Sequence, residues 1–362
     1  MKKLISCMLA LALVLGLCAC GNTEPTTTAG GSSTTEASKT EPVTTAAPTE
    51  SKSNNMRTDR PSTIPEKGTT LRVYSLKGPT SMGISTLLQD SKEGTTHLHY
   101  ESTVCTAADE VTAALISGKA DVALLPANAA AALYNKAGGF SVIAINTLGV
   151  LYVVENGESI QSVKDLAGKT VCLTGKGTTP EYALRYILAA NGIEDQVTLE
   201  FKSEAQEVVA AMSEDVATIG LLPQPFVTAA MMQNDKLRIA LDLNNEWSAV
   251  SEGSALVTGV TVVRNEVLAQ NREMVNIFLE EASHGVKQVN EDPAAAAELI
   301  VNMGIVAKAP IAEKAIPYCN LVCITGEEMK TMLSGYLETL YNQNDKAVGG
   351  AMPADAFYFV GE

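Results

Sequence analysis

Strand candidates alternate with helix candidates along most of this chain, and no other feature restricts the possible folds as much. The segments 71–74, 98–102, 122–125, 141–145 and 150–154 have the composition of short strands, with helix-forming segments between most of them. In the helix candidate 109–117, apolar residues recur at helical spacing, and Gly118 follows as a C-terminal glycine. This alternation predicts an α/β fold with a parallel sheet and helices on both faces.

The same alternation begins again after residue 163. Further strand candidates are 169–174, 197–201, 217–222 and 237–241. Pro180 begins one of the intervening helices, in the first turn where proline is favoured. A folded body of about 290 residues is also larger than one compact core usually is. The sequence therefore predicts a second doubly wound domain, similar to the first.

The last part of the chain is mainly helical. After a strand candidate at 256–264, the helix candidates are 272–290, 293–303, 310–316 and 327–341. Because no further set of strands is expected, these helices should pack on the first domain. Domain one would then comprise residues 70–147 plus 256–362, and domain two would comprise residues 148–255.

The N-terminus has the features of a secretory signal. Two lysines precede an apolar run from Leu4 to Leu17, which is too short to span a bilayer permanently. The ending Leu17-Cys18-Ala19-Cys20 resembles a bacterial lipobox, whose last cysteine is lipidated and becomes the mature N-terminus. We therefore expect residues 1–20 to be a lipoprotein signal peptide and Cys20 to anchor the protein outside the cytoplasm. The alternative is an ordinary signal with a chance cysteine.

Residues 21–69 are mostly Thr, Ser, Pro, Glu and Ala, without an aromatic residue or a leucine. Such a segment buries too little apolar surface to offset its ordering entropy, so we expect a disordered tether. A flexible coil of this length has an r.m.s. reach of roughly 40 Å. That reach would let the folded body move while it stays near a membrane partner.

The charge balance excludes one class of partner. The 362 residues carry a formal net charge of −15. Nucleic acid is a polyanion, so an acidic chain of this kind is not expected to bind it. No second apolar run approaches membrane length, so we expect the body to be soluble.

The cysteines do not indicate a disulfide framework. Three of the seven belong to the signal and lipobox, which leaves Cys105, Cys172, Cys319 and Cys323 for the body. Cys319 and Cys323 are close enough in sequence to pair if the loop between them turns, and the sequence leaves this open. Only three histidines occur and no Cys-x-x-Cys is present, so neither a metal site nor a cofactor is expected.

Three motifs follow one another in the body. The segment 116–123 contains Gly-x-Ala-Asp before an apolar strand, 163–171 reads VKDLAGKTV, and 174–180 reads TGKGTTP. In order and spacing they resemble type II substrate-binding proteins of ABC transporters, most closely the nitrate, taurine, sulfonate and thiamine-precursor branch. The resemblance covers most of residues 71–279.

This resemblance implies a type II periplasmic-binding-protein fold. Two doubly wound domains would be joined by a hinge around a ligand cleft, with the helical C-terminal part packing on domain one. The resemblance implies a binding protein and not an enzyme. With the lipobox, we expect an extracytoplasmic lipoprotein that captures a small polar solute with an anionic or strongly hydrogen-bond-accepting end. The solute would be delivered to the permease of an ABC importer. We expect a monomer, lipid-anchored to the membrane of a Gram-positive bacterium.

In open parallel sheets the ligand binds beyond the carboxyl ends of the strands, and the loops expected there supply candidate ligand-binding residues. They are Lys77, Thr80, Ser81, Met82, Thr103, Asn128 and Thr147 in domain one, and Lys176, Thr178, Thr179, Gln224 and Trp247 in domain two. The loop with Thr80 and Ser81 and the loop with Thr178 and Thr179 each begin a helix and are rich in Gly, Thr and Ser. The free N–H groups and the helix dipole at such a helix start favour an anion. The alternative is that the hydroxyls only cap the helices.

The chain is expected to cross between the domains twice, near residues 146–151 and 242–259. Trp247 is the only tryptophan and lies in the second crossing. Its indole would either stack on a planar ligand or anchor the core. The sequence leaves both roles open.

Signals for catalysis are weak. The chain has no Gly-x-Ser-x-Gly elbow, and His97 and His99 share a strand face without an evident partner. Cys105 precedes a helix, where a thiol pKa is expected to fall, but no base is expected beside it.

Two alternatives to a transport receptor remain: a surface sensor or interaction lipoprotein on the same fold, and an enzyme of the menaquinone-synthesis type. A secretion signal argues against the enzyme.

Overall fold

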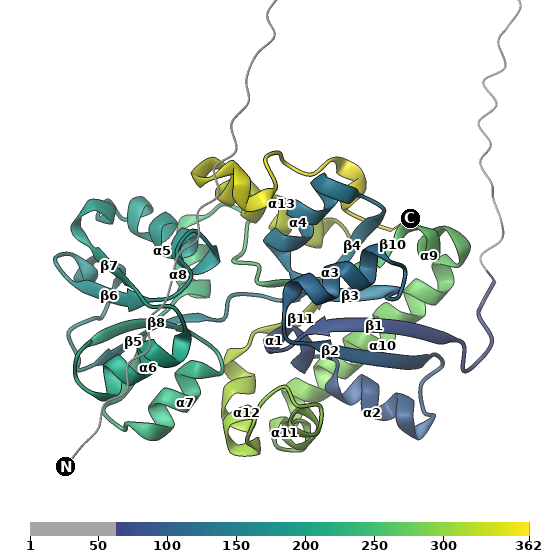
Figure 1. Ribbon diagram of the computed structural model, residues 1–362, viewed down its shortest axis with the longest axis horizontal. Helices are drawn as coiled ribbons and strands as arrows, with labels where there is room; N and C mark the ends of the chain where they lie inside the picture. The colour runs from purple at the N-terminus through teal and green to yellow at the C-terminus, as the bar shows by residue number, and fades with distance from the viewer. Residues whose placement is uncertain (1–62, 362) are drawn as a thin grey trace, which may run out of the picture. The chain divides into compact units, whose positions relative to one another are not determined.

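The computed structural model describes residues 63–361, which contain two β-sheets with helices on both sides of each sheet (Figure 1). We call the part around the six-stranded sheet lobe one and the part around the five-stranded sheet lobe two. The signal peptide, Cys20 and most of the tether lie outside the described residues. Within residues 63–361, no helix is both long and apolar enough to cross a membrane.

Lobe one has the strand order β11-β4-β10-β3-β1-β2. Its strands are β1 (Thr70–Leu76), β2 (His99–Cys105), β3 (Val122–Pro126), β4 (Phe140–Thr147), β10 (Gly259–Arg264) and β11 (Leu321–Ile324). Its longer helices are α2 (Ser85–Glu93), α3 (Ala108–Ile116), α4 (Ala127–Ala137), α10 (Arg272–Glu291), α11 (Pro293–Asn302) and α13 (Gly326–Gln343), and the short ones are α1 (Pro79–Met82), α9 (Asn265–Gln270) and α12 (Ala309–Ala315). Helices α3 and α4 cover one face of the sheet, and α2 and α10 cover the other (Figure 1).

Lobe two has the strand order β7-β6-β8-β5-β9. Its strands are β5 (Leu151–Asn156), β6 (Thr170–Leu173), β7 (Thr198–Phe201), β8 (Ile219–Pro223) and β9 (Leu237–Asp242). Its helices are α5 (Thr179–Ala190), α6 (Ala205–Ser213), α7 (Phe226–Gln233) and α8 (Leu243–Val250). Helices α5 and α8 lie on one face, and α6 and α7 lie on the other (Figure 1). The assignment of 148 and 255 as domain boundaries stays a prediction.

Both sheets are mixed, so the prediction of a parallel sheet holds only in part: β1 pairs in parallel with β2 and β3, and β6 pairs in parallel with β7 and β8. Strand β10 is antiparallel to β3 and β4, and β5 is antiparallel to β8 and β9. The reason lies in the crossings: β5 and β10 are the strands that enter a sheet from the other lobe. Each begins where its neighbours end, with Gly259 opposite Thr147 and Leu151 opposite Pro223. A strand that starts at the carboxyl ends of its neighbours must run against them.

The Gly-x-Ala-Asp step of the first motif has a structural role, because Asp121 links three strands of lobe one. It accepts hydrogen bonds from Arg72 Nε at 2.8 Å, from the Arg72 backbone N at 3.0 Å and from Arg264 Nη2 at 3.1 Å. Burial raises the pKa of Asp121, but the hydrogen bonds from Arg72 and Arg264 outweigh burial and bring the pKa below its usual range. This ion network joins β1, the start of β3 and the end of β10.

Helix α13 contacts both lobes, whereas the C-terminal helices were expected on domain one alone. It packs against α4 and β4 in lobe one and against α5 in lobe two. At its C-terminal end, Gln343 Nε2 donates to Tyr182 O at 3.1 Å. Asn344 Nδ2, immediately after the helix, donates to Tyr182 Oη at 2.6 Å. Helices α10 and α11 pack within lobe one, as expected.

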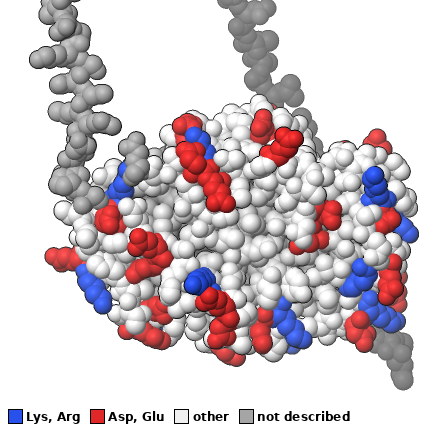
Figure 2. Space-filling view, turned by 180° about the vertical axis from the view of Figure 1, so that it is seen from behind, with Lys and Arg blue, Asp and Glu red and all other residues white. Residues whose placement is uncertain are grey.

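Acidic and basic side chains are interspersed over the face shown in Figure 2, where no area is occupied by basic side chains alone. Several pairs on the protein are ion pairs, such as Arg185 with Glu181 at 2.8 Å and Arg238 with Glu155 at 2.8 Å. On this face the surface is therefore unsuited to the continuous contact that a phosphate backbone requires.

Candidate functional site

The predicted site residues after β1 are tied to their own lobe. Lys77 is exposed, and its backbone N donates to Cys105 O at 2.8 Å. Thr80 and Ser81 are buried in the short helix α1, where Thr80 Oγ1 donates to Leu76 O at 2.9 Å. Ser81 Oγ lies 2.6 Å from the same carbonyl. Both hydroxyls thus have partners inside lobe one and present no surface to a ligand in this conformation.

The remaining candidates of lobe one are spread over different environments. Met82 is fully buried, with its Sδ 3.8 Å from Cys319 Sγ. Thr147 is fully buried as well, and its Oγ1 donates to Asn146 Oδ1 at 2.9 Å. Thr103 is exposed on β2, and Asn128 is half-buried in the first turn of α4. Only Lys77, Thr103 and Asn128 therefore have surface to offer in this conformation.

The loop before α5 already binds an anionic group of the chain itself. Gly177 N donates to Glu181 Oε2 at 2.7 Å, and Thr178 N is bonded to Gly175 O at 2.9 Å. Burial opposes ionisation of Glu181, but the hydrogen bonds from Gly177 N and from Arg185 Nε outweigh it and lower the pKa of this carboxyl. A solute anion would compete with Glu181 for this helix start.

The side chains of the same loop also have local partners. Thr178 is exposed and its Oγ1 donates to Gly175 O at 2.7 Å, while Thr179 Oγ1 accepts from Tyr336 Oη at 3.3 Å. The Lys176 ammonium lies 5.7 Å from the centre of the Phe201 ring. Thr179 is therefore part of the contact between α13 and lobe two.

Gln224 differs from the other candidates because half of its amide has no partner. It follows β8 directly and only 2% of it is exposed. Its Oε1 accepts from Thr228 Oγ1 at 2.8 Å and from Thr228 N at 3.3 Å. Within residues 63–361, its Nε2 has no hydrogen-bond partner. A buried donor without a partner is costly, which makes this atom a candidate for contact with a ligand.

Gln224 lines a pocket of about 340 Å³ to which both lobes contribute, and we call it the interlobe pocket. Lobe two supplies Gln224 from the segment between β8 and α7, Thr228, Met231 and Met232 from α7, and Ile239 from β9. Lobe one supplies Lys314 from α12 and Tyr318 just after it. Next to it, Tyr152 Oη of lobe two donates to Tyr318 O at 2.7 Å. The interlobe pocket is the candidate functional site.

Sequence reasoning found only one member of this pocket. Gln224 was predicted because it follows a strand. Met231, Ile239 and Lys314 lie within or beside elements whose helical or strand pattern explains them without a ligand. Nothing local in the sequence indicates that α7 and α12 come together.

Of the two roles considered for Trp247, stacking on a ligand and anchoring the core, the structure shows the second. It is fully buried, and its ring lies between Tyr186, at a centroid distance of 4.4 Å, and Tyr336, at 5.6 Å. The indole Nε1 donates to Ser254 Oγ at 3.0 Å, so its polar atom is satisfied. In this conformation Trp247 joins α5, α8 and α13 and offers no face to a ligand.

The thiols are poorly suited to nucleophilic chemistry. All four cysteines of the described body are free, so Cys319 and Cys323 do not form a disulfide. Burial raises the pKa of Cys319 to about 12 and that of Cys323 to about 11. Burial also raises the pKa of Cys105, with a smaller effect of Glu110, so the expectation of a lowered value there is wrong. Among the described residues, no group of three His, Cys, Asp or Glu is placed to hold a metal ion.

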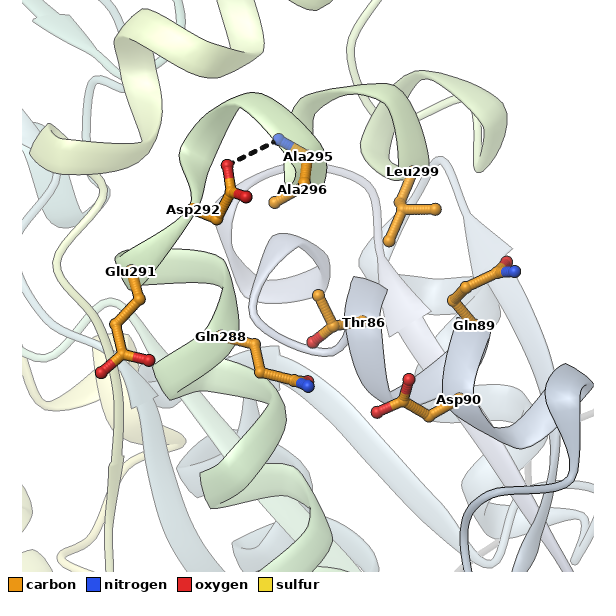
Figure 3. Close-up of a pocket in the computed structure, with 9 residues that line it drawn as sticks. All are labelled: Thr86, Gln89, Asp90, Gln288, Glu291, Asp292, Ala295, Ala296 and Leu299. Carbon is orange, nitrogen blue, oxygen red and sulfur yellow. Dashed lines mark hydrogen bonds between the residues drawn. The ribbon is translucent and has the colours of Figure 1, made fainter.

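A second pocket, of about 310 Å³, lies on lobe one between α2, α10 and α11 (Figure 3). The carboxylates of Asp90, Glu291 and Asp292 line it, and Asp292 is already used, because it accepts from Ala295 N at 3.0 Å. Gln288 also lines this pocket and its Oε1 has no partner within the described part of the chain. Since all lining residues come from one lobe, binding here would not respond to a movement of the lobes.

Comparison with known proteins identifies the family and the fold. The profile of the family described as NMT1/THI5 like matches residues 103–296, more than half of the chain. No curated protein sequence matches the chain.

Solved structures share the architecture at low sequence identity. An ABC transporter protein from Parabacteroides distasonis is similar over 80% of this chain and 99% of its own, with 22% identity and a TM-score of 0.68. The alkanesulfonate-binding protein SsuA from Xanthomonas axonopodis pv. citri, bound to MOPS, covers 82% of this chain and 99% of its own at 12% identity and a TM-score of 0.59. A mutant of DszB in complex with biphenyl-2-sulfinic acid covers 80% and 96% at 13% identity and a TM-score of 0.56. These likenesses confirm the predicted type II periplasmic-binding-protein fold.

Proposed function

The chain belongs to the NMT1/THI5-like family, and from this premise we propose that it is an extracytoplasmic solute-binding protein of an ABC importer. It captures a small solute between its two lobes and delivers it to a membrane permease. The known roles of two proteins with the same fold support this proposal: one is an ABC transporter protein and the other is an alkanesulfonate-binding protein. The acidic chain would act as a monomer, with no nucleic acid as partner.

One observation carries the proposal: the buried, unpartnered Gln224 Nε2 points to a ligand in a pocket shared by both lobes. A ligand that touches both lobes binds their closed arrangement better than an open one, and so shifts the equilibrium toward closure. A permease can distinguish a closed, loaded receptor from an open, empty one. Binding between lobes thus supports a role in transport.

Catalysis is the second candidate, because one similar structure is a DszB mutant bound to a sulfinic acid. An activated cysteine needs a lowered pKa, whereas burial raises the pKa of every thiol in the described body. We therefore favour binding over catalysis. A sensor or interaction lipoprotein would bind a solute in the same way, and permease and ATPase genes beside this one would favour transport.

The test is to identify the solute and to measure closure. The mature chain would be purified from its host under mild conditions, and the small molecules released on denaturation would be identified by mass spectrometry. Added back to chain refolded without it, the solute should reduce the radius of gyration in small-angle X-ray scattering. An unchanged radius at saturation would contradict capture by closure of the lobes.

The lipid anchor is a separate part of the proposal, and it predicts the behaviour of a Cys20→Ala variant. Without this thiol the chain cannot be lipidated, and the apolar run before it is too short to hold the body permanently after cleavage. We expect the variant to be released into the medium or to remain unprocessed, as judged by cell fractionation and intact-mass measurement. A Cys18→Ala variant is the control and should stay anchored. Processed Cys20→Ala protein bound to membranes as firmly as wild type would refute the assignment.

A further inference from the structure

We propose that helix α13 holds the two lobes together on one side of the molecule and thereby fixes their arrangement in the solute-free protein. The lobes then separate only on the other side, where α7 of lobe two meets α12 of lobe one (Figure 1). This inference concerns a joint of the protein itself. It depends neither on the identity of the solute nor on the proposed transport role.

Helix α13 is tied to lobe one at both of its ends. Strand β11, directly before the helix, pairs with β4. After the helix, residues 345–359 return to lobe one, and we call them the C-terminal strap. Asn135 Nδ2 of α4 donates to Val348 O of the strap at 2.8 Å, and Phe359 N donates to Val142 O of β4 at 2.9 Å. The helix therefore cannot leave lobe one without breaking the contacts on both sides of it.

Part of the same helix is buried against lobe two. The Tyr336 ring lies 5.6 Å from the ring of Trp247, and the two side chains are 1% and 0% exposed. One apolar core cluster contains buried side chains of β4 in lobe one, of α13, and of α5 and α8 in lobe two. Separating the lobes at this place would expose that apolar surface to water, which is unfavourable.

The chain segment that crosses from α8 in lobe two to β10 in lobe one lies directly against α13. Gly335 is the point of contact, because a Cβ on this residue would lie 2.6 Å from Ser254 Cβ. Ser254 Oγ in turn accepts from Trp247 Nε1 at 3.0 Å. The helix, the crossing and the indole are thus one packed unit, which has no room for a further methyl group between Gly335 and Ser254.

The contact between α7 and α12, on the other side, is looser. Tyr152 Oη donates to Tyr318 O at 2.7 Å, but the interlobe pocket lies next to this hydrogen bond. Met232 and Tyr318, which line that pocket, are each 46% exposed. Water already reaches this side, so moving the lobes apart here exposes less new apolar surface than at α13.

The test uses Trp247 as a natural reporter of the joint, because it is the only tryptophan of the chain. Gly335→Ala adds the methyl group for which there is no room and should force α13 away from Ser254. In the solute-free mature chain, we expect the Trp247 emission to shift to the red and its quenching by acrylamide to increase. The radius of gyration, measured by small-angle X-ray scattering, should rise in the same variant.

Gly285→Ala is the matched control. Gly285 lies in α10, where a Cβ would be 3.1 Å from Leu87 Cβ, so the same methyl group is added at a close contact within lobe one. This variant should change neither the Trp247 emission nor the radius of gyration. Tyr152→Phe removes the interlobe hydrogen bond on the α7–α12 side, and it should leave the Trp247 emission unchanged as well.

A milder pair of variants decides the question if Gly335→Ala does not fold. Gln343→Ala combined with Asn344→Ala removes both side-chain hydrogen bonds from the end of α13 to Tyr182. Asn191→Ala is the control, because it removes an amide hydrogen bond to a carbonyl within lobe two. Only the double variant should have a larger radius of gyration than wild type, and an unchanged radius would contradict the inference.

The inference is overturned if Gly335→Ala leaves either the Trp247 emission or the radius of gyration at its wild-type value. It is also overturned if Gly285→Ala has the same effect, or if Tyr152→Phe shifts the emission too. None of these measurements uses a solute, so their failure leaves the proposed function standing. Conversely, a radius that no co-purified solute reduces would contradict capture by closure and leave the role of α13 intact.

Discussion

Replacing Trp247 with alanine should destabilise the protein by about 3–5 kcal/mol, the range for removing a large aromatic side chain from a core. The indole is fully buried between Tyr186 and Tyr336, and its Nε1 is bonded to Ser254. Its loss would leave a cavity where α5, α8 and α13 meet. Urea unfolding at neutral pH, followed by circular dichroism because the only tryptophan is gone, measures the change.

Trp247→Phe is the matched variant, since it keeps an aromatic ring but loses the hydrogen bond and part of the volume. It should cost clearly less than the alanine variant. Because Trp247 is closed off from solvent, Trp247→Phe should bind the co-purified solute as wild type does. A variant of nearly unchanged stability and much weaker solute binding would instead restore the stacking role of Trp247.

Replacing Asp121 with asparagine should cost about 2–4 kcal/mol at neutral pH, somewhat less than breaking a fully buried ion pair. The reduction reflects the 38% exposure of the Arg72 side chain, where water screens the charge. The variant removes the charge that neutralises Arg72 and Arg264. Glu266→Gln is the control, because Glu266 pairs with the same Arg264 but its side chain is 75% exposed, and it should change stability very little.

The stability difference between wild type and Asp121→Asn should also depend on pH. The folded pKa of Asp121 lies below the usual value, so its stabilising effect is complete above the unfolded pKa of about 3.9. The effect is lost as the pH falls through the lower, folded value. The stability difference between wild type and Asp121→Asn should therefore shrink below about pH 4. A difference that stays constant into acid would show that the pKa of Asp121 is the same in the folded and the unfolded protein.

The sequence predicted the elements well wherever the pattern was local. The alternation of strand and helix candidates from residue 71 to 241 corresponds to β1 through β9, with boundaries within a few residues. The direction of each strand relative to its neighbours in the sheet was not predictable in the same way. An apolar strand such as 259–264 has the same composition whether it runs parallel or antiparallel, and only its entry from the other lobe reverses it.

Other elements were missed because they carry little signal of their own. Strand β11 has four residues, and it is recognisable only by its pairing with β4. Helix α8 lies in a segment expected to be a crossing, although Asp242 caps it by accepting from Asn244 N at 2.9 Å.

The candidate site was predictable only in part. A glutamine that follows a strand can be selected from sequence, but its unpartnered Nε2 depends on how Thr228 orients the amide. Likewise, the helix start at Gly175–Thr179 looks available in the sequence, and the carboxylate of Glu181 that occupies it lies one turn further on. Satisfaction of polar atoms is a three-dimensional property, so local patterns overestimated the number of free donors.

The place of β10 in its sheet has a consequence for the newly made chain. Because β10 lies between β3 and β4, these two strands have no partner on their facing edges until residue 264 has been synthesised. Lobe two has no such dependence, since β5 to β9 form one continuous stretch. Unpaired apolar strand edges promote aggregation, so export should be most hazardous while the first half of the chain waits for β10. A chain that ends before residue 259 would keep the unpaired edges of β3 and β4 permanently. Early termination should therefore be more damaging than the loss of a C-terminal helix.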